Sequence, residues 1–196
     1  MAAVIRLVEL NDAPEISAIY KEFVEDTAVS FETIAPTPEE IRQRISERID
    51  QYPWIVVEVD GTVAGYAYAS QHRARFHYQW SVDFTVYIHR DYRKLGLGSQ
   101  LYAVLKRLSV LVGYVSAYAG IALPNEASVN LHKRIGFSEV GVYKNVGFKL
   151  GRWHDVSWWH CQLIDPPALP PQIIPLIELV DTAVWQAAFN IAAENA

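Results

Sequence analysis

The sequence of 196 residues is poor in cysteine, in long apolar runs and in excess positive charge. Cys161 is its only cysteine, which excludes an intrachain disulfide and a multi-cysteine metal site, so we expect a reducing cytoplasm as its setting. No apolar run reaches about 18 residues, which predicts that no segment spans a membrane. Lys and Arg number 17 against 22 Asp and Glu, and this deficit argues against broad binding to nucleic acid.

The composition is that of a globular protein, with 51% hydrophobic and 20% charged residues. Segments with a period of two alternate with helix-like segments, which favours an α/β or α+β domain. We expect this domain to cover residues 1–165. Residues 166–196 begin with five of the chain's ten prolines and are expected to form an extended arm that ends in a helix over 177–193.

Capping and turn residues predict where several elements begin. Asp12 and Thr37 are expected to cap helices over 12–27 and 37–49, and Asp60-Gly61 is typical of a hairpin turn between two strands in 54–70. A further helix begins near Ser99, and another runs from Asn125 to Arg134. The remaining β-rich segments cover residues 4–10, 82–88, 115–122, 137–143 and 155–163.

Two glycines, Gly96 and Gly98, lie between a β-rich run and a helix. A turn of this kind directs backbone N–H groups and the positive end of the helix dipole at one point, where a phosphate binds well. Arg90, Arg93 and Lys94 add positive charge in an acidic chain. The same glycines could instead form only a tight turn. The residues that follow fit neither a P-loop nor a Rossmann fingerprint.

The run Arg93 to Gly98 resembles the acetyl-CoA loop of the GNAT superfamily of N-acetyltransferases. The segment "NEASVNLHKRIGF", from Asn125 to Phe137, is similar to the Asn-led helix of that superfamily. Over residues 4–175 the chain resembles the phosphinothricin and methionine sulfoximine N-acetyltransferase group within it. This resemblance implies a GNAT fold, in which helices flank a central mixed, mostly antiparallel twisted sheet. It also implies acetyl-CoA at a V-shaped splay between strands, and a homodimer.

The resemblance also implies which residues contact acetyl-CoA. A backbone N–H on the strand around 86–88 would stabilise the oxyanion, and Asn125 would bind the pantetheine arm or serve only as a helix cap. The implied contacts are Val86, Tyr87, Ile88, Arg93, Lys94, Leu95, Gly96, Leu97, Gly98, Ser99 and Asn125.

Two residues are candidates for proton transfer. Asp83 stands at the position of a base, where the resembled group has Glu, so a bridging water is expected to link the shorter side chain to the amine. His132 stands near the expected position of the CoA sulfur and could relay a proton. Either residue could instead be structural.

Substrate contacts are implied at seven positions. Arg73 and Arg75 suit a carboxylate-bearing substrate, although charged loop residues often only face water. Thr85 could equally be an ordinary strand residue. The full set is Phe31, Arg73, Arg75, Tyr78, Thr85, His154 and Val156. The histidines show no spacing typical of a metal site, so we expect no metal.

The leading interpretation is an enzyme that transfers an acetyl group from acetyl-CoA to the amino group of a small amino-acid-like molecule by direct attack. One alternative acceptor is a protein N-terminus or a polyamine. Another alternative is an acyl-CoA-binding module that has lost catalysis.

Overall fold

The structure is a computed structural model, and it describes residues 3–190. The strands are β1 (Ala3–Leu7), β2 (Trp54–Val59), β3 (Thr62–Gln71), β4 (Ser81–Ile88), β5 (Ser116–Ala122), β6 (Ser138–Lys149) and β7 (Arg152–Gln162). The α-helices are α1 (Ala13–Glu25), α2 (Pro38–Ser46), α3 (Leu97–Val112), α4 (Glu126–Arg134), α5 (Leu176–Leu179) and α6 (Ala183–Ala188). Short 3-10 turns cover Leu10–Asp12, Phe76–Tyr78 and Arg90–Tyr92. None of the helices within residues 3–190 is long and apolar enough to cross a membrane.

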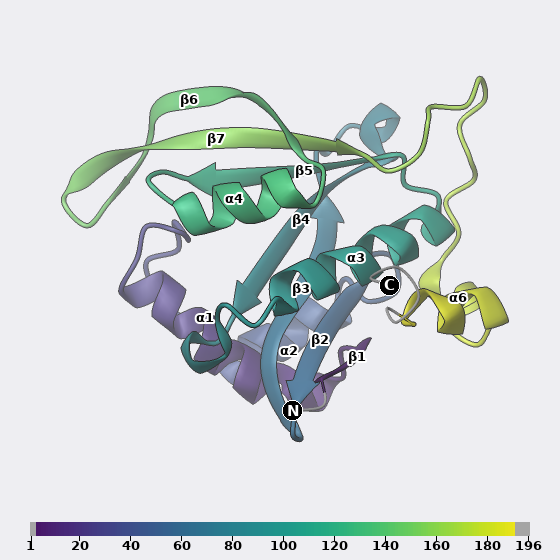
Figure 1. Ribbon diagram of the computed structural model, residues 1–196, viewed down its shortest axis with the longest axis horizontal. Coiled ribbons are helices and arrows are strands. Elements are labelled where there is room, and N and C mark those ends of the chain that lie inside the picture. Colours follow the sequence, from purple (N-terminus) through teal and green to yellow (C-terminus); the bar gives the residue numbers. More distant parts are fainter. Residues whose placement is uncertain (1–2, 191–196) are drawn as a thin grey trace.

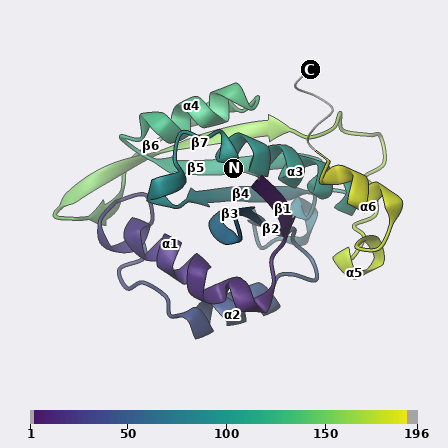
Figure 2. The ribbon, with the colours of Figure 1, turned by 60° about the horizontal axis from the view of Figure 1, so that its bottom comes forward.

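The strands form one seven-stranded sheet in the order β1-β2-β3-β4-β5-β7-β6. Helices α1 and α2 cover one face of this sheet, and α3 and α4 cover the other (Figure 2). Neighbouring strands are antiparallel except for β4 and β5. The mixed, mostly antiparallel sheet flanked by helices that the sequence predicted is confirmed.

The parallel pair β4 and β5 stays together for only a short distance. Pairing covers Ser81 with Ser116, Val82 with Ala117 and Asp83 with Tyr118, and then ends. Beyond this point the two strands diverge, as Figure 1 shows. The sheet is therefore open in its middle, and Asp83 lies at the apex of the opening.

Each face of the sheet has its own core. Leu101, Leu105 and Leu108 of α3 share one face of the helix by their spacing, and all three are fully buried against the inner strands. The face under α1 and α2 is aromatic instead, with Trp54 and Tyr66 buried there. Such burial on both faces fixes the strand that carries Asp83.

The turn and one of the two caps formed as predicted. Asp60 and Gly61 have φ values of 50° and 82°, as a tight hairpin turn requires. Thr37 and Glu40 form a reciprocal capping box at α2. The prediction for Asp12 was wrong: its carboxylate makes no cap hydrogen bond to α1, because it accepts bonds from the guanidinium of Arg6 at 2.7 and 2.8 Å.

Two regions differ from their predicted lengths. β6 and β7 are longer than the segments 137–143 and 155–163, because a turn at Leu150-Gly151, with φ values of 51° and 76°, joins them into a long hairpin. The single C-terminal helix expected over 177–193 is instead two short helices, α5 and α6, since the Thr182 side chain caps a new helix. Residues 191–193 of that expectation lie outside the described residues.

The proline-rich arm lies against the main body. The amide of Ile174 donates to the Val112 carbonyl at 2.9 Å, and the Trp80 indole donates to the Pro171 carbonyl at 2.8 Å. The boundary between 1–165 and 166–196 stays a prediction, but the arm adds buried side chains to the core below α3.

Candidate active site

A small cavity of about 100 Å³ occupies the opening between β4 and β5. Strand β4 contributes Thr85, Val86 and Tyr87, which follow the last paired residue, Asp83, along the strand. The facing wall comes from β5, from Asn125 and His132 around α4, and from Tyr102 of α3. The backbone of the open strand β4 is thus accessible where the sheet no longer pairs.

Asp83 sits at the apex of this opening and is bound by a histidine. Its Oδ1 lies 2.7 Å from Nδ1 of His72, which follows β3. Burial raises the pKa of the Asp83 carboxyl above its usual value, and the hydrogen bond from His72 opposes this shift. Asp83 is therefore a partly desolvated carboxylate with a fixed partner.

His72 is itself held by aromatic rings. Its imidazole stacks on Tyr118 of β5, with ring centres 4.2 Å apart and an interplanar angle of 13°. Trp158 of β7 meets the imidazole edge-on at 6.1 Å, and the guanidinium of Arg73 lies 5.8 Å from the Trp158 ring. The site therefore draws on β3, β4, β5 and β7 together.

Sequence reasoning missed His72 as a site residue. The signal was available in the antiparallel pairing of β3 with β4, which sets Ser70 opposite Asp83 and Gln71 opposite Val82. A residue just beyond β3 must then lie beside the start of β4. A pairing of side chains across two strands leaves no short-range spacing of the kind that marks a metal site in a sequence.

His132 lies inside the cavity wall and is held at both ring nitrogens. Its Nδ1 lies 2.8 Å from the Ser128 carbonyl, and its Nε2 lies 3.2 Å from the Tyr102 hydroxyl. The carbonyl can only accept, so Nδ1 carries the proton and, in the neutral ring, Nε2 accepts from Tyr102. Burial lowers the pKa of His132, which favours this neutral form.

The glycine turn before α3 has the expected shape. Gly96 has a φ of +79°, and a Cβ added there would meet no atom within 4 Å, so the space above the turn is open. Helix α3 begins directly after it at Leu97. The first amides of a helix have no intrahelical partner, so this end offers N–H groups to an anion.

Several side chains around the glycine turn are engaged with the protein itself and do not face the expected ligand. Arg90 and Arg93 both bind Glu22 of α1, at 3.2 and 2.9 Å, so their charge is already paired. Leu97 is 4% exposed and belongs to the core, which leaves only its backbone for a ligand. Lys94 is exposed, with a φ of 66°. Ile88, of the predicted donor-binding strand, packs against the core outside the cavity lining.

The connection between α1 and α2 reaches across to the β6–β7 hairpin. The Phe31 ring lies so close to Gly147 that a Cβ there would come within 2.4 Å of it. Phe31 also meets His154 edge-on, with ring centres 6.2 Å apart. The buried Lys149 ammonium donates to the carbonyls of Val24 and Ser30, both at 2.6 Å, and its burial lowers its pKa. These contacts hold one edge of the site closed.

The other predicted substrate residues divide into two groups. Val156 lies on β7 with its Cγ1 3.6 Å from the position of a Cβ on Gly120, which lines the cavity. By contrast, Arg75 and Tyr78 are exposed, and no hydrogen bond, ion pair or ring contact joins either to Asp83 within residues 3–190.

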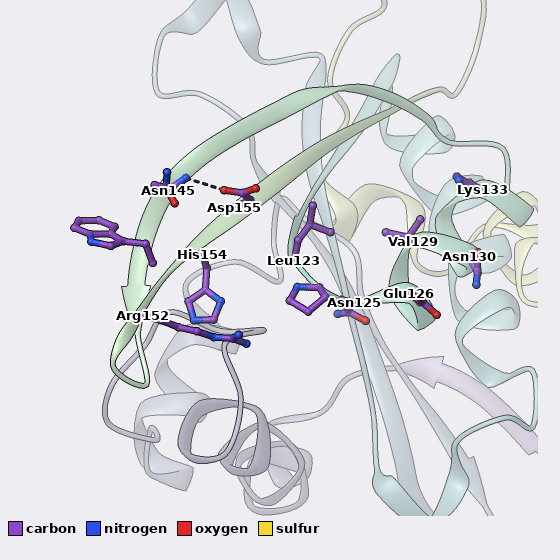
Figure 3. A pocket seen from close by; sticks show the side chains of 12 residues that line it. Leu123, Asn125, Glu126, Val129, Asn130, Lys133, Asn145, Arg152, His154 and Asp155 are labelled. Carbon is purple, nitrogen blue, oxygen red and sulfur yellow. Dashed lines mark hydrogen bonds between the residues drawn. The ribbon is translucent and has the colours of Figure 1, made fainter.

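A larger polar cavity of about 690 Å³ lies between α4 and the β6–β7 hairpin (Figure 3). It meets the smaller cavity at Asn125, whose side chain also caps α4 by accepting from the Ser128 amide at 3.1 Å. Arg152 and His154 face it from the hairpin. No cluster of three or more His, Cys, Asp or Glu able to hold a metal occurs in the described part of the chain.

Residues 5–158 match the family model described as "Acetyltransferase (GNAT) domain". The chain belongs to the GNAT acetyltransferase family. It is 38% identical to the phosphinothricin N-acetyltransferase of Streptomyces viridochromogenes over 89% of this chain and 95% of that one. It is 31% identical to the L-methionine sulfoximine/L-methionine sulfone acetyltransferase of Salmonella typhimurium, covering 85% and 97%.

A solved structure of a GNAT phosphinothricin acetyltransferase from Sinorhizobium meliloti, in complex with acetyl-CoA, has the same fold. The TM-score is 0.83 at 32% identity, with 88% of this chain and 94% of that chain covered. The family and the group that the sequence motifs indicated are confirmed. In this GNAT acetyltransferase, a partly buried carboxylate and an open strand lie at a split in the sheet, and a glycine turn leads from that strand to a helix N-terminus.

Proposed function

We propose that this acetyltransferase moves an acetyl group from acetyl-CoA to the amino group of a small amino-acid-like molecule of the phosphinothricin or methionine sulfoximine type. The opening between β4 and β5, with a partly buried carboxylate at its apex, is the observation that carries the proposal. The names of the relatives support this substrate class.

The residues around the opening fit an acetyl-CoA molecule bound along it. The N–H groups at the start of α3, behind Gly96 and Gly98, would hold the pyrophosphate, and Asn125 would bind the pantetheine arm. The small cavity suits only the thioester end. A backbone N–H of the unpaired part of β4, around Val86, would donate to the carbonyl oxygen as negative charge develops.

The acceptor would approach from the side of Asp83. Thr85 lines the cavity beside it, and Phe31 with His154 closes the hairpin edge. Arg73 stands over Trp158, and its charge partly opposes the rise that burial causes in the pKa of Asp83, so it is near enough to attract a substrate carboxylate. We assign Arg73 the larger part of that recognition, because no hydrogen bond, ion pair or ring contact joins Arg75 to this cluster within residues 3–190.

His132 would serve the departing thiolate through Tyr102. Its neutral ring accepts from the Tyr102 hydroxyl, which also lines the cavity. The pair fixes a hydroxyl next to the expected path of the sulfur. His132 therefore acts as a positioning residue for that hydroxyl.

A panel assay of CoA release tests the proposed function. Acceptors would be free amino acids, phosphinothricin, methionine sulfoximine, N-terminal peptides and spermidine, each with acetyl-CoA. We expect turnover with the amino-acid-like compounds, sequential kinetics and no acetylated enzyme by mass spectrometry. Turnover restricted to peptides or spermidine would contradict the acceptor class. Tight CoA binding without turnover on any acceptor would indicate a binding module instead.

We further propose that the enzyme works as a homodimer in the cytoplasm. Large apolar side chains stand exposed along the β6–β7 hairpin, at Val140, Tyr143, Val146, Phe148, Leu150 and Trp153. A second copy would cover such a surface. Light scattering of the purified chain measures this directly, and a monomer at micromolar concentration would contradict it.

A further inference from the structure

One oxygen of the carboxylate at the apex is already engaged by a neighbouring histidine. Oδ1 of Asp83 is bound to Nδ1 of His72 at 2.7 Å, a short distance for an N–H···O bond and typical of a charge-assisted pair. Asp83 is also a short side chain on a strand that is paired on both sides at this position. The sequence led us to expect a bridging water between Asp83 and the amine, and the imidazole of His72 is a fixed group that can take that place.

The contact at Nδ1 determines the state of the other nitrogen. An ionised carboxylate only accepts, so Nδ1 of His72 carries the proton and Nε2 of the neutral ring is left as an acceptor. No hydrogen bond to Nε2 occurs within residues 3–190, although the side chain is only 12% exposed. The ring therefore offers one proton acceptor without a partner in the described chain, next to Asp83 at the apex.

The imidazole cannot easily turn away from this orientation. Tyr118 stacks on one of its faces, Trp158 meets it edge-on, and Asp83 holds Nδ1. A base must be held within a fraction of an ångström of its working position to be effective, and an aromatic stack supplies such a constraint. His132 shows the contrast, because both of its nitrogens are already engaged.

We infer that His72 is the general base of the acetyl transfer and that Asp83 orients it, as a dyad. The acceptor ammonium gives one proton to Nε2 of His72, and the freed lone pair forms a C–N bond with the acetyl carbonyl carbon. The C–S bond then breaks, the second N–H proton leaves with the thiolate as the CoA thiol, and the imidazolium returns its proton to solvent. This assignment rests on the proposed function.

The charged and titratable groups around His72 come from three strands and from the connection that follows β3. Asp83 lies on β4 and stabilises the imidazolium; Arg73, next along the chain, opposes it. Tyr118 on β5 stacks on His72, and His160 on β7 contacts Tyr118 in turn, with the Tyr118 and His160 ring centres 4.9 Å apart. Within residues 3–190, Asp83 is the charged group in hydrogen-bond contact with His72.

The kinetic test compares His72→Gln with wild type on an amino-acid acceptor across pH. At pH 7 we expect kcat/KM to fall on the order of 10²- to 10⁴-fold, the usual contribution of a general base. The loss should shrink toward pH 9, because an α-amino group with a pKa of about 8 then loses its proton without help. The KM for acetyl-CoA should stay unchanged. His77→Gln, an exposed residue of the same connection, is the matched control and should behave as wild type.

A second measurement reads the dyad without turnover. Side-chain ¹⁵N NMR of the full chain should show His72 protonated at Nδ1, with a downfield proton that disappears in Asp83→Asn. An Nε2–H tautomer, or wild-type kcat/KM and pH dependence in His72→Gln, would overturn the dyad. If the wild-type protein acetylates no amine in the panel, both the proposed function and the assignment of His72 as the base are wrong. If wild type is active and His72→Gln retains that activity, only the assignment of the base is wrong.

Discussion

His132 is a buried histidine whose pKa is lowered because burial disfavours its charged form. In the unfolded chain the ring has its ordinary pKa of 6.5. As the pH falls toward 6.5, the unfolded chain therefore binds more protons than the folded protein does. Stability linked to His132 is present above this window and is lost as the pH drops through it.

This linkage predicts a pH-dependent difference between two variants. Between about pH 7.5 and about 5.5, His132→Gln should lose less unfolding free energy than wild type, by at most about 1.4 kcal/mol per pH unit. The exposed His77→Gln should keep the wild-type slope. Urea denaturation at several pH values measures both. An unchanged slope in His132→Gln would assign the dependence to other groups.

At the level of single residues, the sequence placed part of the site. Thr85, Val86, Asn125 and His132 were named from motifs, and all four line the opening. Arg93 was expected to face a phosphate, but the structure pairs it with Glu22 from α1. No motif records a contact between segments so far apart, and the partner of a charge is decided only by folding.

Among the elements, the turn from β4 into α3 depends on the left-handed conformation of Gly96. A side chain there adopts this conformation at a cost of about 1–2 kcal/mol. The space above the turn is open, so a methyl group would fit and would project where an anion is expected.

Gly96→Ala should therefore lower stability by about 1–2 kcal/mol and also raise the KM for acetyl-CoA several-fold. Gly61→Ala is the matched control, since Gly61 has a φ of +82° and equally open surroundings in a remote hairpin. It should show the same loss of stability with an unchanged KM. Equal KM values in both variants would argue against a phosphate site at this turn.

Element lengths were harder to predict than element types. The sequence pattern divided the hairpin of β6 and β7 into shorter strands. Asn145 and Leu150 have positive φ values there, which could not be predicted from their residue types. The pairing of β6 also shifts between Tyr143 and Gly147. Such irregularities are imposed by the packing of Phe31 on Gly147 and of Lys149 on the end of α1.

At the scale of the whole molecule, the C-terminal arm completes the core under α3. Leu176 and Trp185 are 2% and 1% exposed and belong to the same cluster as the inner strands. The amide of Leu176 also donates to the Asp50 carbonyl at 3.0 Å. The arm is thus bound to the same body as the sheet and α3.

Trp185→Ala should therefore destabilise the whole protein by about 3–5 kcal/mol. Val184→Ala, on the exposed side of the same helix at 57% exposure, should change stability by less than about 0.5 kcal/mol. Thermal or urea unfolding compares the two. Similar values would mean that α6 contributes little to the fold and that residues 166–196 are an appendage.

The sequence by itself determined the family, the alternation of elements, the glycine turn before α3 and the position of Asp83. These features depend on local spacing, on backbone freedom and on side-chain chemistry, all of which can be read from the order of the residues. The tertiary structure decided which groups meet: His72 with Asp83, Arg93 with Glu22, and Lys149 with the end of α1. Strand pairing and burial bring these residues together, because contacts between distant segments follow from the packing of the whole sheet.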